Sequence, residues 1–349
     1  MGRGPASARG GPGVRRAALF AVFLLLLGCP GGGTSPRRQV VVYCALDRLF
    51  AQPILERFAR ETGIEVLPKW DTEATKTTGL VQALRSEAER VRCDVFWNNE
   101  IAHSVALARD GLLAPYESPS AEDLPAWARD PERRWTGFAA RARVILVNTE
   151  AVPADALPTS LDDFLDPRWK GRCGIAKPLF GTTATHVAYL FAKNAEAAKR
   201  WLAGLRANEV VVCAGNADVK DRVASGELAF GLTDTDDANL ALRAKRPVRV
   251  VFPGQGPDGE GTLLLPNTVA VLRGAPHPAE ARRLVDYLLA PEVERALAAS
   301  RSAQIPLRPS LPRAPWIPSD LRAAPVDWQA VAAALPAARD FVRREFLRR

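Results

Sequence analysis

Histidine is scarce in this sequence, and several common catalytic motifs are missing. Only three histidines occur among 349 residues, and His103, His186 and His277 are too scattered to form an H-E-x-x-H metal site. The sequence contains no G-x-S-x-G nucleophile elbow and no phosphate-binding P-loop. Residues 254–259 spell G-x-G-x-x-G, but a predicted strand follows them instead of the helix that a dinucleotide site requires. These absences argue against the common classes of enzyme.

The sequence also lacks a hydrophobic run long enough to span a bilayer. The run from Ala17 to Leu27 contains eleven apolar residues, whereas a membrane-spanning helix needs about 20. Four arginines and no acidic residue precede this run, a pattern typical of a secretory signal peptide. We therefore predict a signal peptide at residues 1–28 and export of the rest of the chain.

The end of this apolar run, Leu26-Leu27-Gly28-Cys29, resembles the lipobox of bacterial lipoproteins. The resemblance implies that Cys29 is lipidated and that residues 29–38 form a tether. It places the protein in the periplasm or at the outer face of the cytoplasmic membrane. Because Leu27 is a less usual residue at its position, an ordinary cleaved signal peptide is the alternative.

Closely spaced cysteines are absent as well, which argues against a C-x-x-C zinc or redox site. Four cysteines follow Cys29, namely Cys44, Cys93, Cys173 and Cys213. An exported protein can form disulfides, and the predicted strands place Cys44 near Cys93 and Cys173 near Cys213. Two bridges and four buried thiols are both compatible with the sequence, and we favour the buried thiols.

No strong excess of one charge marks the exported part of the chain. The formal net charge of the whole sequence is +8, and the four arginines of the signal leave +4 for the remainder. Such a small, dispersed excess does not indicate binding to nucleic acid. About 320 residues follow the signal, more than a single hydrophobic core usually supports, so we expect two lobes.

Strand and helix patterns alternate along the exported part. A first unit runs from a β-branched strand at Gln39–Cys44 to a helix that ends at Asp110, and a second runs from Arg143 to Ala244. Alternation of this kind predicts an α/β fold with parallel strands. The predicted parts are a first α/β lobe (39–140 and about 268–310), a second α/β lobe (141–267), and a Pro-rich tail with a C-terminal helix (311–349).

Polar residues follow the predicted strands at the end where an open α/β sheet binds its ligands. Acids and amides follow the first strands, and a Gly-Thr-Thr helix start in the second unit has free amides that suit an anion. The candidate ligand-binding residues are Asp47, Asn98, Asn99, Glu100, Gly181, Thr182, Thr183, Asn216, Thr233, Asp234, Thr235, Asp236 and Asp237. They predict a cleft that is acidic on several sides and has one anion-binding corner.

Short segments spread over most of the exported chain resemble one protein family. These segments are Val41–Tyr43, Phe58–Val66, Asp94–Trp97, Gly111–Pro115, Ala140–Val144, Asp166–Gly171 and Ile305–Arg308. In this order and spacing they are similar to the bacterial ferric-iron-binding proteins, which are type II periplasmic solute-binding proteins. The resemblance implies two hinged α/β lobes around a central ligand cleft. It also implies a monomeric receptor of an ABC importer, with a permease and its ATPase in the inner membrane as partners.

The resemblance further implies a ligand. In the iron-binding relatives a His, a Glu and two adjacent Tyr hold ferric iron, and an anion completes the shell. On this sequence the His position is Asp47, the Glu position is Glu100 or the neighbouring Asn99, and the Tyr pair falls on Thr235 and Asp236. The phenolates are missing, so the carboxylates of Asp47, Glu100 and Asp236 remain as candidate ligands for Fe(III) or another metal ion.

Several alternatives remain open. An organic solute such as an aminophosphonate or a polyamine would suit the same acidic cleft. An exported hydrolase could use a carboxylate pair such as Asp47 and Glu100 for acid and base catalysis. The acids at 234–237 could instead cap and begin a helix. For Arg141 and Arg143 we expect a surface or hinge position, with at most one of them reaching the cleft.

Overall fold

The computed structural model describes Met1, residues 38–71 and residues 78–348. The rest of the predicted signal peptide and the predicted lipidation site Cys29 lie outside the described residues. Within the described part we find no helix with the length and apolar character that crossing a bilayer requires. From Arg38 onward the described residues belong to one compact unit, so the predicted boundaries between two lobes stay a prediction.

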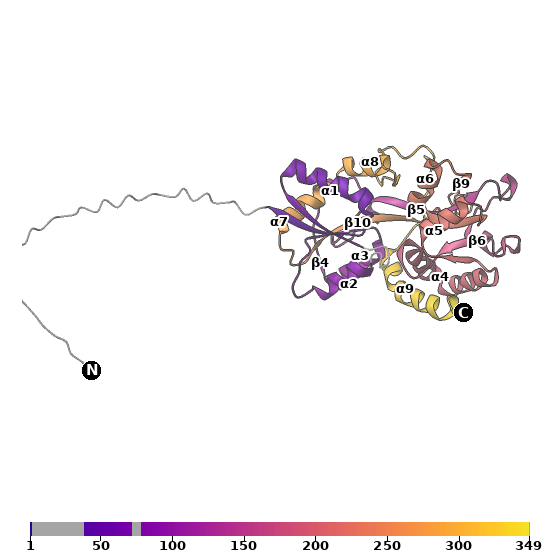
Figure 1. Ribbon diagram of the computed structural model, residues 1–349, viewed down its shortest axis with the longest axis horizontal. Helices are drawn as coiled ribbons and strands as arrows, with labels where there is room; N and C mark the ends of the chain where they lie inside the picture. The colour runs from indigo at the N-terminus through magenta and orange to yellow at the C-terminus, as the bar shows by residue number, and fades with distance from the viewer. Residues whose placement is uncertain (2–37, 72–77, 349) are drawn as a thin grey trace, which may run out of the picture. The chain divides into compact units, whose positions relative to one another are not determined.

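Ten strands in the described part form one mixed sheet. In chain order they are β1 (Gln39–Cys44), β2 (Glu65–Trp70), β3 (Val95–Asn98), β4 (Leu113–Ala114), β5 (Thr136–Asn148), β6 (Cys173–Ala176), β7 (Val211–Cys213), β8 (Phe230–Asp234), β9 (Val248–Val251) and β10 (Leu264–Leu272). Their order is β2-β1-β3-β10-β5-β8-β6-β7, with β4 paired to β10 and β9 paired to β5 (Figure 1). The strands β1, β2 and β3 form one parallel group and β6, β7 and β8 another, as the alternating pattern predicts.

The long strand β5 joins the two parallel groups. Its first half, Thr136–Ala142, pairs with β10, and its second half, Arg143–Asn148, pairs with β8 and β9. All 13 of its residues are buried. The sequence predicts a strand only from Arg143, because Gly137–Ala142 is rich in small residues and lacks the β-branched side chains that indicate a strand. The strand therefore begins earlier than predicted.

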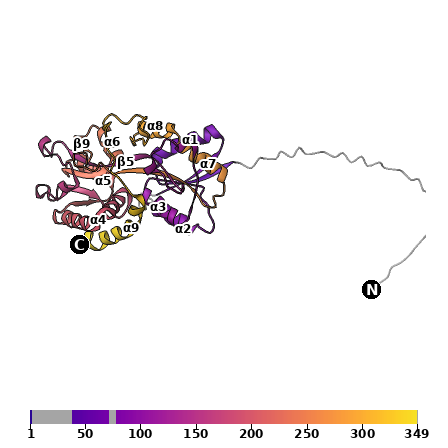
Figure 2. The ribbon, with the colours of Figure 1, turned by 180° about the vertical axis from the view of Figure 1, so that it is seen from behind.

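Nine α-helices in the described part cover the two faces of the sheet. They are α1 (Arg48–Thr62), α2 (Thr78–Ser86), α3 (Ile101–Arg109), α4 (Gly181–Ala207), α5 (Asn216–Ala224), α6 (Thr235–Arg243), α7 (Pro278–Leu288), α8 (Pro291–Ala299) and α9 (Trp328–Phe341). One apolar core packs under α1, α5, α6, α7 and α8, and a second packs under α2, α3, α4 and α9 (Figures 1 and 2). The sheet thus separates two helical layers.

Local sequence sets the ends of several helices. Helix α1 ends at Gly63, whose φ of +67° is a left-handed conformation that glycine adopts without strain. Helix α4 contains a break at Asn194, where φ is −160° and ψ is 101°. The sequence predicts two successive helices there, Thr183–Lys193 and Ala195–Arg206, and the break lies between them.

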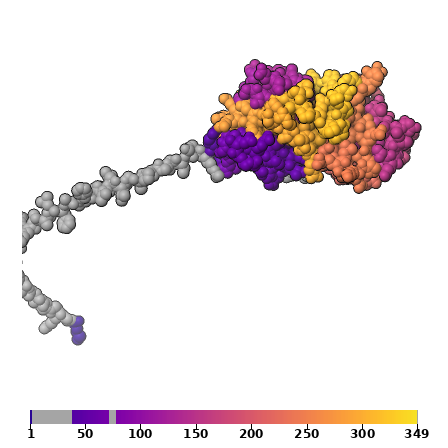
Figure 3. Space-filling view, turned by 90° about the horizontal axis from the view of Figure 1, so that it is seen from above, coloured from indigo at the N-terminus to yellow at the C-terminus, as the bar shows by residue number. Residues whose placement is uncertain are grey.

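The C-terminal residues pack against the body of the protein. Helix α9 contacts both α3 and α4, and Nη2 of Arg339 lies 3.2 Å from Nε2 of His103. The Pro-rich stretch before α9 is predicted to lie extended over the surface, yet it buries Leu311, Ile317 and Leu321. Figure 3 shows residues from the last part of the chain, in yellow, packed against the rest of the protein on the face seen from above. The tail is therefore anchored by apolar side chains.

A buried ion pair fastens β5 to α8 and to the segment that follows it. The carboxylate of Glu294 accepts hydrogen bonds from the backbone N–H of Ala139 at 2.8 Å and of Leu307 at 2.7 Å. It also accepts one from Nη1 of Arg308 at 2.8 Å, and Nε of Arg308 donates to Asp123. Ala139 has a φ of +39°, an unusual value for a residue with a Cβ. The Glu294 carboxylate holds β5 in this conformation, two residues before Arg141.

The four cysteines of the described part are free thiols. Cys44, Cys93, Cys173 and Cys213 are all buried, and none is bridged to another. Four buried thiols are the alternative that the sequence favours. Burial raises the pKa of each thiol, because a buried thiolate loses its hydration.

Candidate functional site

A cleft of about 770 Å³ opens beyond the carboxyl ends of β1, β6, β7 and β8. Seven of the predicted residues line it, and they are Asp47, Gly181, Thr183, Asn216, Asp234, Asp236 and Asp237. The other six are buried and do not line the cleft, and they are Asn98, Asn99, Glu100, Thr182, Thr233 and Thr235. The structure therefore gathers residues that lie up to about 190 positions apart in the sequence at one end of the sheet.

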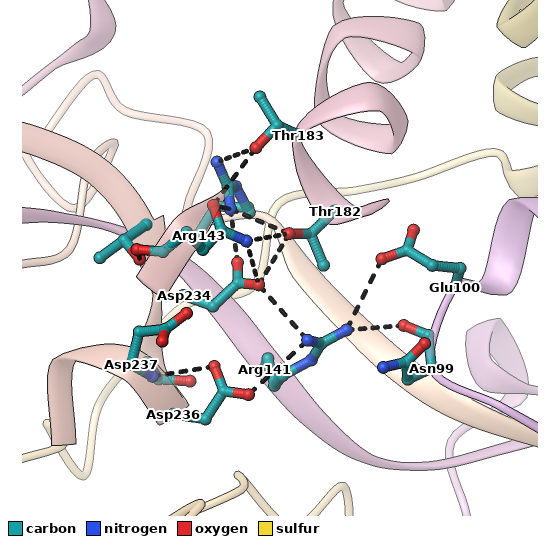
Figure 4. Close-up of polar contacts among 12 residues, drawn as sticks. Asn99, Glu100, Arg141, Arg143, Thr182, Thr183, Asp234, Asp236 and Asp237 are labelled. Carbon is teal, nitrogen blue, oxygen red and sulfur yellow. Dashed lines mark hydrogen bonds and ion pairs between the residues drawn. The ribbon is translucent and has the colours of Figure 1, made fainter. Parts of the chain in front are cut away.

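Asp234 is the centre of the polar network, as Figure 4 shows. Its carboxylate is buried and accepts hydrogen bonds from Arg143 at 2.5 Å, Thr182 at 2.7 Å and Asn216 at 3.0 Å. Burial disfavours the charged form, but the guanidinium groups of Arg143 and Arg141 outweigh this and hold the pKa of Asp234 below its usual value. Asp234 occupies the N-cap position of α6, yet its side chain bonds to none of the helix amides. The acids at 234–237 therefore begin the helix, as that alternative proposes, with Asp236 and Asp237 in its first turn, but the Asp234 side chain does not cap it.

Arg143 is fully enclosed in this network. Its Nη1 donates to Thr182 Oγ1 at 3.0 Å and to Asn216 Oδ1 at 3.2 Å, and its Nη2 donates to Thr183 Oγ1 at 3.1 Å. Nδ1 of His186 lies 3.5 Å from its Nε. Burial lowers the pKa of His186 to about 3, and the positive charge of Arg143 lowers it further. His186 is therefore neutral and supports the position of Arg143.

Arg141 reaches the cleft and contacts groups from both sides of it. Its Nη2 donates to the carbonyl oxygen of Asn99 at 2.7 Å and lies 3.7 Å from Glu100 Oε1. Its Nη1 lies 3.4 Å from Asp234 Oδ2 and 3.6 Å from Asp236 Oδ2. Burial alone would lower the pKa of the guanidinium, but these carboxylates raise it. Arg141 carries a permanent positive charge.

The expected surface position of the two arginines is wrong, because neither faces outward, whereas only Arg141 lines the cleft, in line with the expectation that at most one reaches it. Arg141 and Arg143 are two residues apart on a strand, and side chains at this spacing point to the same face. Both side chains are buried in the site, with relative exposures of 9% and 0%. The i, i+2 spacing in the sequence could have revealed this, had the strand been predicted to begin before Arg143.

Glu100 lies between Arg141 and α4. Its Oε2 accepts a hydrogen bond from Thr185 Oγ1 at 2.6 Å. Burial raises the pKa of Glu100 to about 7, and the positive charge of Arg141 counteracts part of this effect. Asn98 donates to Ser104 Oγ at 2.9 Å and to the Glu100 carbonyl at 2.6 Å, so it shapes the turn that carries Glu100.

The acids at the start of α6 face the cleft. Burial raises the pKa of Asp236 to about 6, the charges of Asp234 and Asp47 add to this, and Arg141 opposes it. The backbone N–H of Asp237 donates to Asp236 Oδ1 at 3.0 Å. Since the charges of Asp234 and Asp47 both act on Asp236, the carboxylates of these three residues lie close together at this corner of the cleft.

The predicted metal ligands Asp47, Glu100 and Asp236 are not gathered into a metal centre. Among the residues that the structure describes, no group of three His, Cys, Asp or Glu side chains is arranged to hold a metal ion. The guanidinium of Arg141 lies between Glu100 and Asp236 instead. Metal ligation by these carboxylates stays a prediction.

Other residues in the lining of the cleft suit an anion. Lys177 lines the cleft, and so do Gly181 and Thr183 at the start of α4 and Asn216 at the start of α5. Free backbone amides at the N-terminus of a helix favour negative charge. Gly181 has a φ of +60°, which a residue with a side chain rarely adopts. The cleft lining therefore combines carboxylates with helix starts that attract anions.

The remaining residues near the cleft hold its strands and helices in place. Thr235 Oγ1 accepts a hydrogen bond from the backbone N–H of Ala142 at 3.1 Å, and Thr233 Oγ1 donates to the Asn216 carbonyl at 3.2 Å. Trp97 at the end of β3 is fully buried and packs against Phe138 in the core. These side chains hold β5, β8 and α5 together beside the cleft.

Comparison with known proteins identifies relatives over most of the chain. The chain is 29% identical to iron uptake protein A1 of Synechocystis, over 79% of this chain and 78% of that protein. It is 26% identical to the major ferric iron-binding protein of Neisseria meningitidis, over 82% of this chain and 86% of that protein. The structure of iron-bound HitA from Pseudomonas aeruginosa superposes with a TM-score of 0.78 at 25% identity, over 87% of this chain and 99% of that one.

These matches confirm the predicted fold and the predicted family resemblance. The fold is the two-lobed α/β fold of periplasmic binding proteins. The family described as bacterial extracellular solute-binding protein matches residues 99–333, about two thirds of the chain. Its members are binding proteins that serve ABC transporters outside the cytoplasm, and they are not enzymes. The chain is therefore a bacterial extracellular solute-binding protein.

Proposed function

We propose that this protein captures ferric iron together with an anion and delivers it to the permease of an ABC importer. The observation that carries the proposal is the mixed lining of the cleft, which brings Asp47, Asp236 and Asp237 together with Lys177 and the start of α4. Carboxylate oxygens suit a hard cation, and a helix N-terminus suits the accompanying anion. The names of the similar proteins from Synechocystis and Neisseria meningitidis point to the same cargo.

Binding is proposed to close the cleft. Asp47 and Glu100 follow strands of the first parallel group, whereas Asn216, Asp236 and Asp237 follow strands of the second. A solute bound by both sets favours the closed form, which is the form that the permease recognises. A shift from 1% to 99% closed requires that the solute bind the closed form more tightly by about 5.5 kcal/mol.

A lipid anchor at Cys29 would keep the receptor near its permease. The support for this proposal is the lipobox-like sequence Leu26–Cys29. Mass spectrometry of the protein from its membrane fraction should show a lipid on Cys29, and Cys29→Ser should release the protein in soluble form. A soluble wild-type protein that begins after an ordinary signal-peptidase cleavage would contradict the anchor.

A second candidate ligand is an organic amine that carries a phosphonate or carboxylate. The observation that favours it is the ion pairing of Arg141 with Asp236 and Glu100, together with the missing metal centre in the described residues. An aminophosphonate would place its amine near the carboxylates of the cleft and its phosphonate near Lys177.

A thermal-shift experiment on the chelated protein separates the two candidates. Ferric citrate should raise the apparent stability by about 2.7 kcal/mol at a hundredfold excess over Kd. Asp236→Asn should abolish the rise, and the exposed control Asp258→Asn should leave it unchanged. A rise with 2-aminoethylphosphonate and none with ferric citrate would replace iron by the organic solute.

A further inference from the structure

Arg141 places a positive charge where the acidic groups of the cleft converge. Asn99 and Glu100, which it contacts on one side, follow β3. Asp234 and Asp236, which it contacts on the other side, lie at the junction of β8 and α6. Figure 4 shows the guanidinium between these two sets of side chains. The position that a bound cation would need is thus already held by a cation of the protein.

The neighbouring Arg143 has a different role. It is fully buried, it does not line the cleft, and its contacts with Asp234, Thr182 and Thr183 measure 2.5 to 3.1 Å. Arg141 does line the cleft, and its three distances to carboxylates are 3.4 to 3.7 Å. These are longer than good hydrogen bonds, so Arg141 can exchange them for shorter bonds to an incoming oxyanion.

The charge of Arg141 discriminates between classes of solute. Two unit positive charges about 4 Å apart, at an effective dielectric constant of about 20, repel strongly enough to weaken binding roughly a thousandfold. A bare divalent cation would be repelled more. An oxyanion in the same place would instead receive two parallel, charge-assisted hydrogen bonds from the guanidinium fork.

We propose that Arg141 is a specificity-determining residue, which makes the cleft select solutes that carry an oxyanion and reject bare cations. Oxygen atoms of the solute take over the Arg141 donors that point at Asp234 and Asp236, and the carboxylate of Asp236, which lines the cleft, then faces the positive part of the solute. This inference rests on the proposed function and narrows it. Ferric iron enters the cleft as an anionic chelate, such as a citrate complex, and not as a bare ion.

The test is isothermal titration calorimetry on the exported, chelated protein and its variants. Arg141→Gln removes the charge, Arg141→Lys keeps it, and Arg249→Gln is a matched control on an exposed residue of β9. The titrants are manganese(II) chloride, ferric citrate and 2-aminoethylphosphonate. We expect Arg141→Gln to bind ferric citrate at least tenfold more weakly than the wild type and manganese(II) at least tenfold more tightly. Arg141→Lys and the control Arg249→Gln should bind ferric citrate and manganese(II) with the affinities of the wild type.

The outcomes separate this inference from the iron proposal. Wild-type affinity of Arg141→Gln for ferric citrate, without a gain for manganese(II), would overturn the role of Arg141. A second outcome is that Arg141→Gln binds manganese(II) more tightly than the wild type does, while the wild type binds 2-aminoethylphosphonate but not ferric citrate. This outcome would support the role of Arg141 in specificity and reject iron as the cargo. If circular dichroism shows that Arg141→Gln is unfolded, Arg141→Lys decides, because manganese(II) binding by that variant would refute the charge argument.

Discussion

The buried pair of Asp234 and Arg143 should be a main determinant of stability near the cleft. Asp234→Asn keeps the volume of the side chain but removes the negative charge that faces Arg143 at 2.5 Å. The Arg143 side chain is fully buried, so it would keep its charge without a counter-ion. Breaking a buried pair in this way costs about 3–5 kcal/mol, which corresponds to a fall in Tm of about 5–8 °C for a folded part of this size.

Urea unfolding followed by circular dichroism measures this cost. We expect the unfolding midpoint of Asp234→Asn to fall while the slope m stays unchanged, because the folded state keeps its compactness. The exposed control Asp258→Asn should change the free energy of unfolding by less than about 0.5 kcal/mol. A cost below about 1 kcal/mol for Asp234→Asn would show that Arg143 does not depend on Asp234 as its counter-ion.

A double-mutant cycle isolates the pair itself. Arg143→Gln combined with Asp234→Asn removes both charges, so the double variant should be more stable than the sum of the single costs predicts. Coupling energies of about 0.5–3 kcal/mol are usual for such contacts. Strict additivity would mean that the two side chains do not stabilise each other.

Three further predictions follow from other parts of the structure. Glu294→Ala removes the acceptor of two backbone amides and of Arg308. In urea unfolding it should lower the free energy of unfolding by about 3 kcal/mol or more. A loss as small as that of a typical surface substitution would contradict the role of Glu294. Burial raises the pKa of Glu100 from 4.5 to about 7, so its contribution to stability is present below pH 4.5 and is lost as the pH rises through 7. Glu100→Gln should therefore be more stable than the wild type at pH 8 and show a flatter pH dependence in unfolding at pH 5 and 8, whereas an unchanged pH dependence would refute this. Gly231→Ala would place a Cβ against Val219 and should lower stability by about 1–3 kcal/mol in thermal unfolding, and a neutral effect would show that α5 can shift.

The sequence predicts the framework of the fold well, because the framework depends on local patterns. The β-branched run Gln39–Cys44 coincides with β1. The change of pattern around Asn194 coincides with the break in α4. Strands and helices with clear periodicity are visible in the sequence since their apolar residues repeat with the period of the element.

The electrostatics of the site depend on packing and are harder to predict. Most of the acids around the cleft are predicted, but the sequence does not reveal that Arg141 lies among them, because the small residues before Arg143 conceal the first half of β5. Nor can it show that Asp234 faces Arg143 while Asp236 faces the cleft, since both are acids of one short segment. Arg141 and Arg143 share one strand, and Asp234 and Asp236 lie at the start of one helix. Within each pair the two side chains have different roles, and these roles are set only when the strand and the helix pack together.

Anomalous X-ray diffraction from crystals grown with ferric citrate would locate the bound metal. We expect an iron peak inside the cleft, between the carboxylate of Asp236 and the anion-binding residues near Lys177, with citrate oxygens within hydrogen-bond distance of Arg141. An iron peak outside the cleft, or a cleft without iron in crystals that contain ferric citrate, would contradict this expectation.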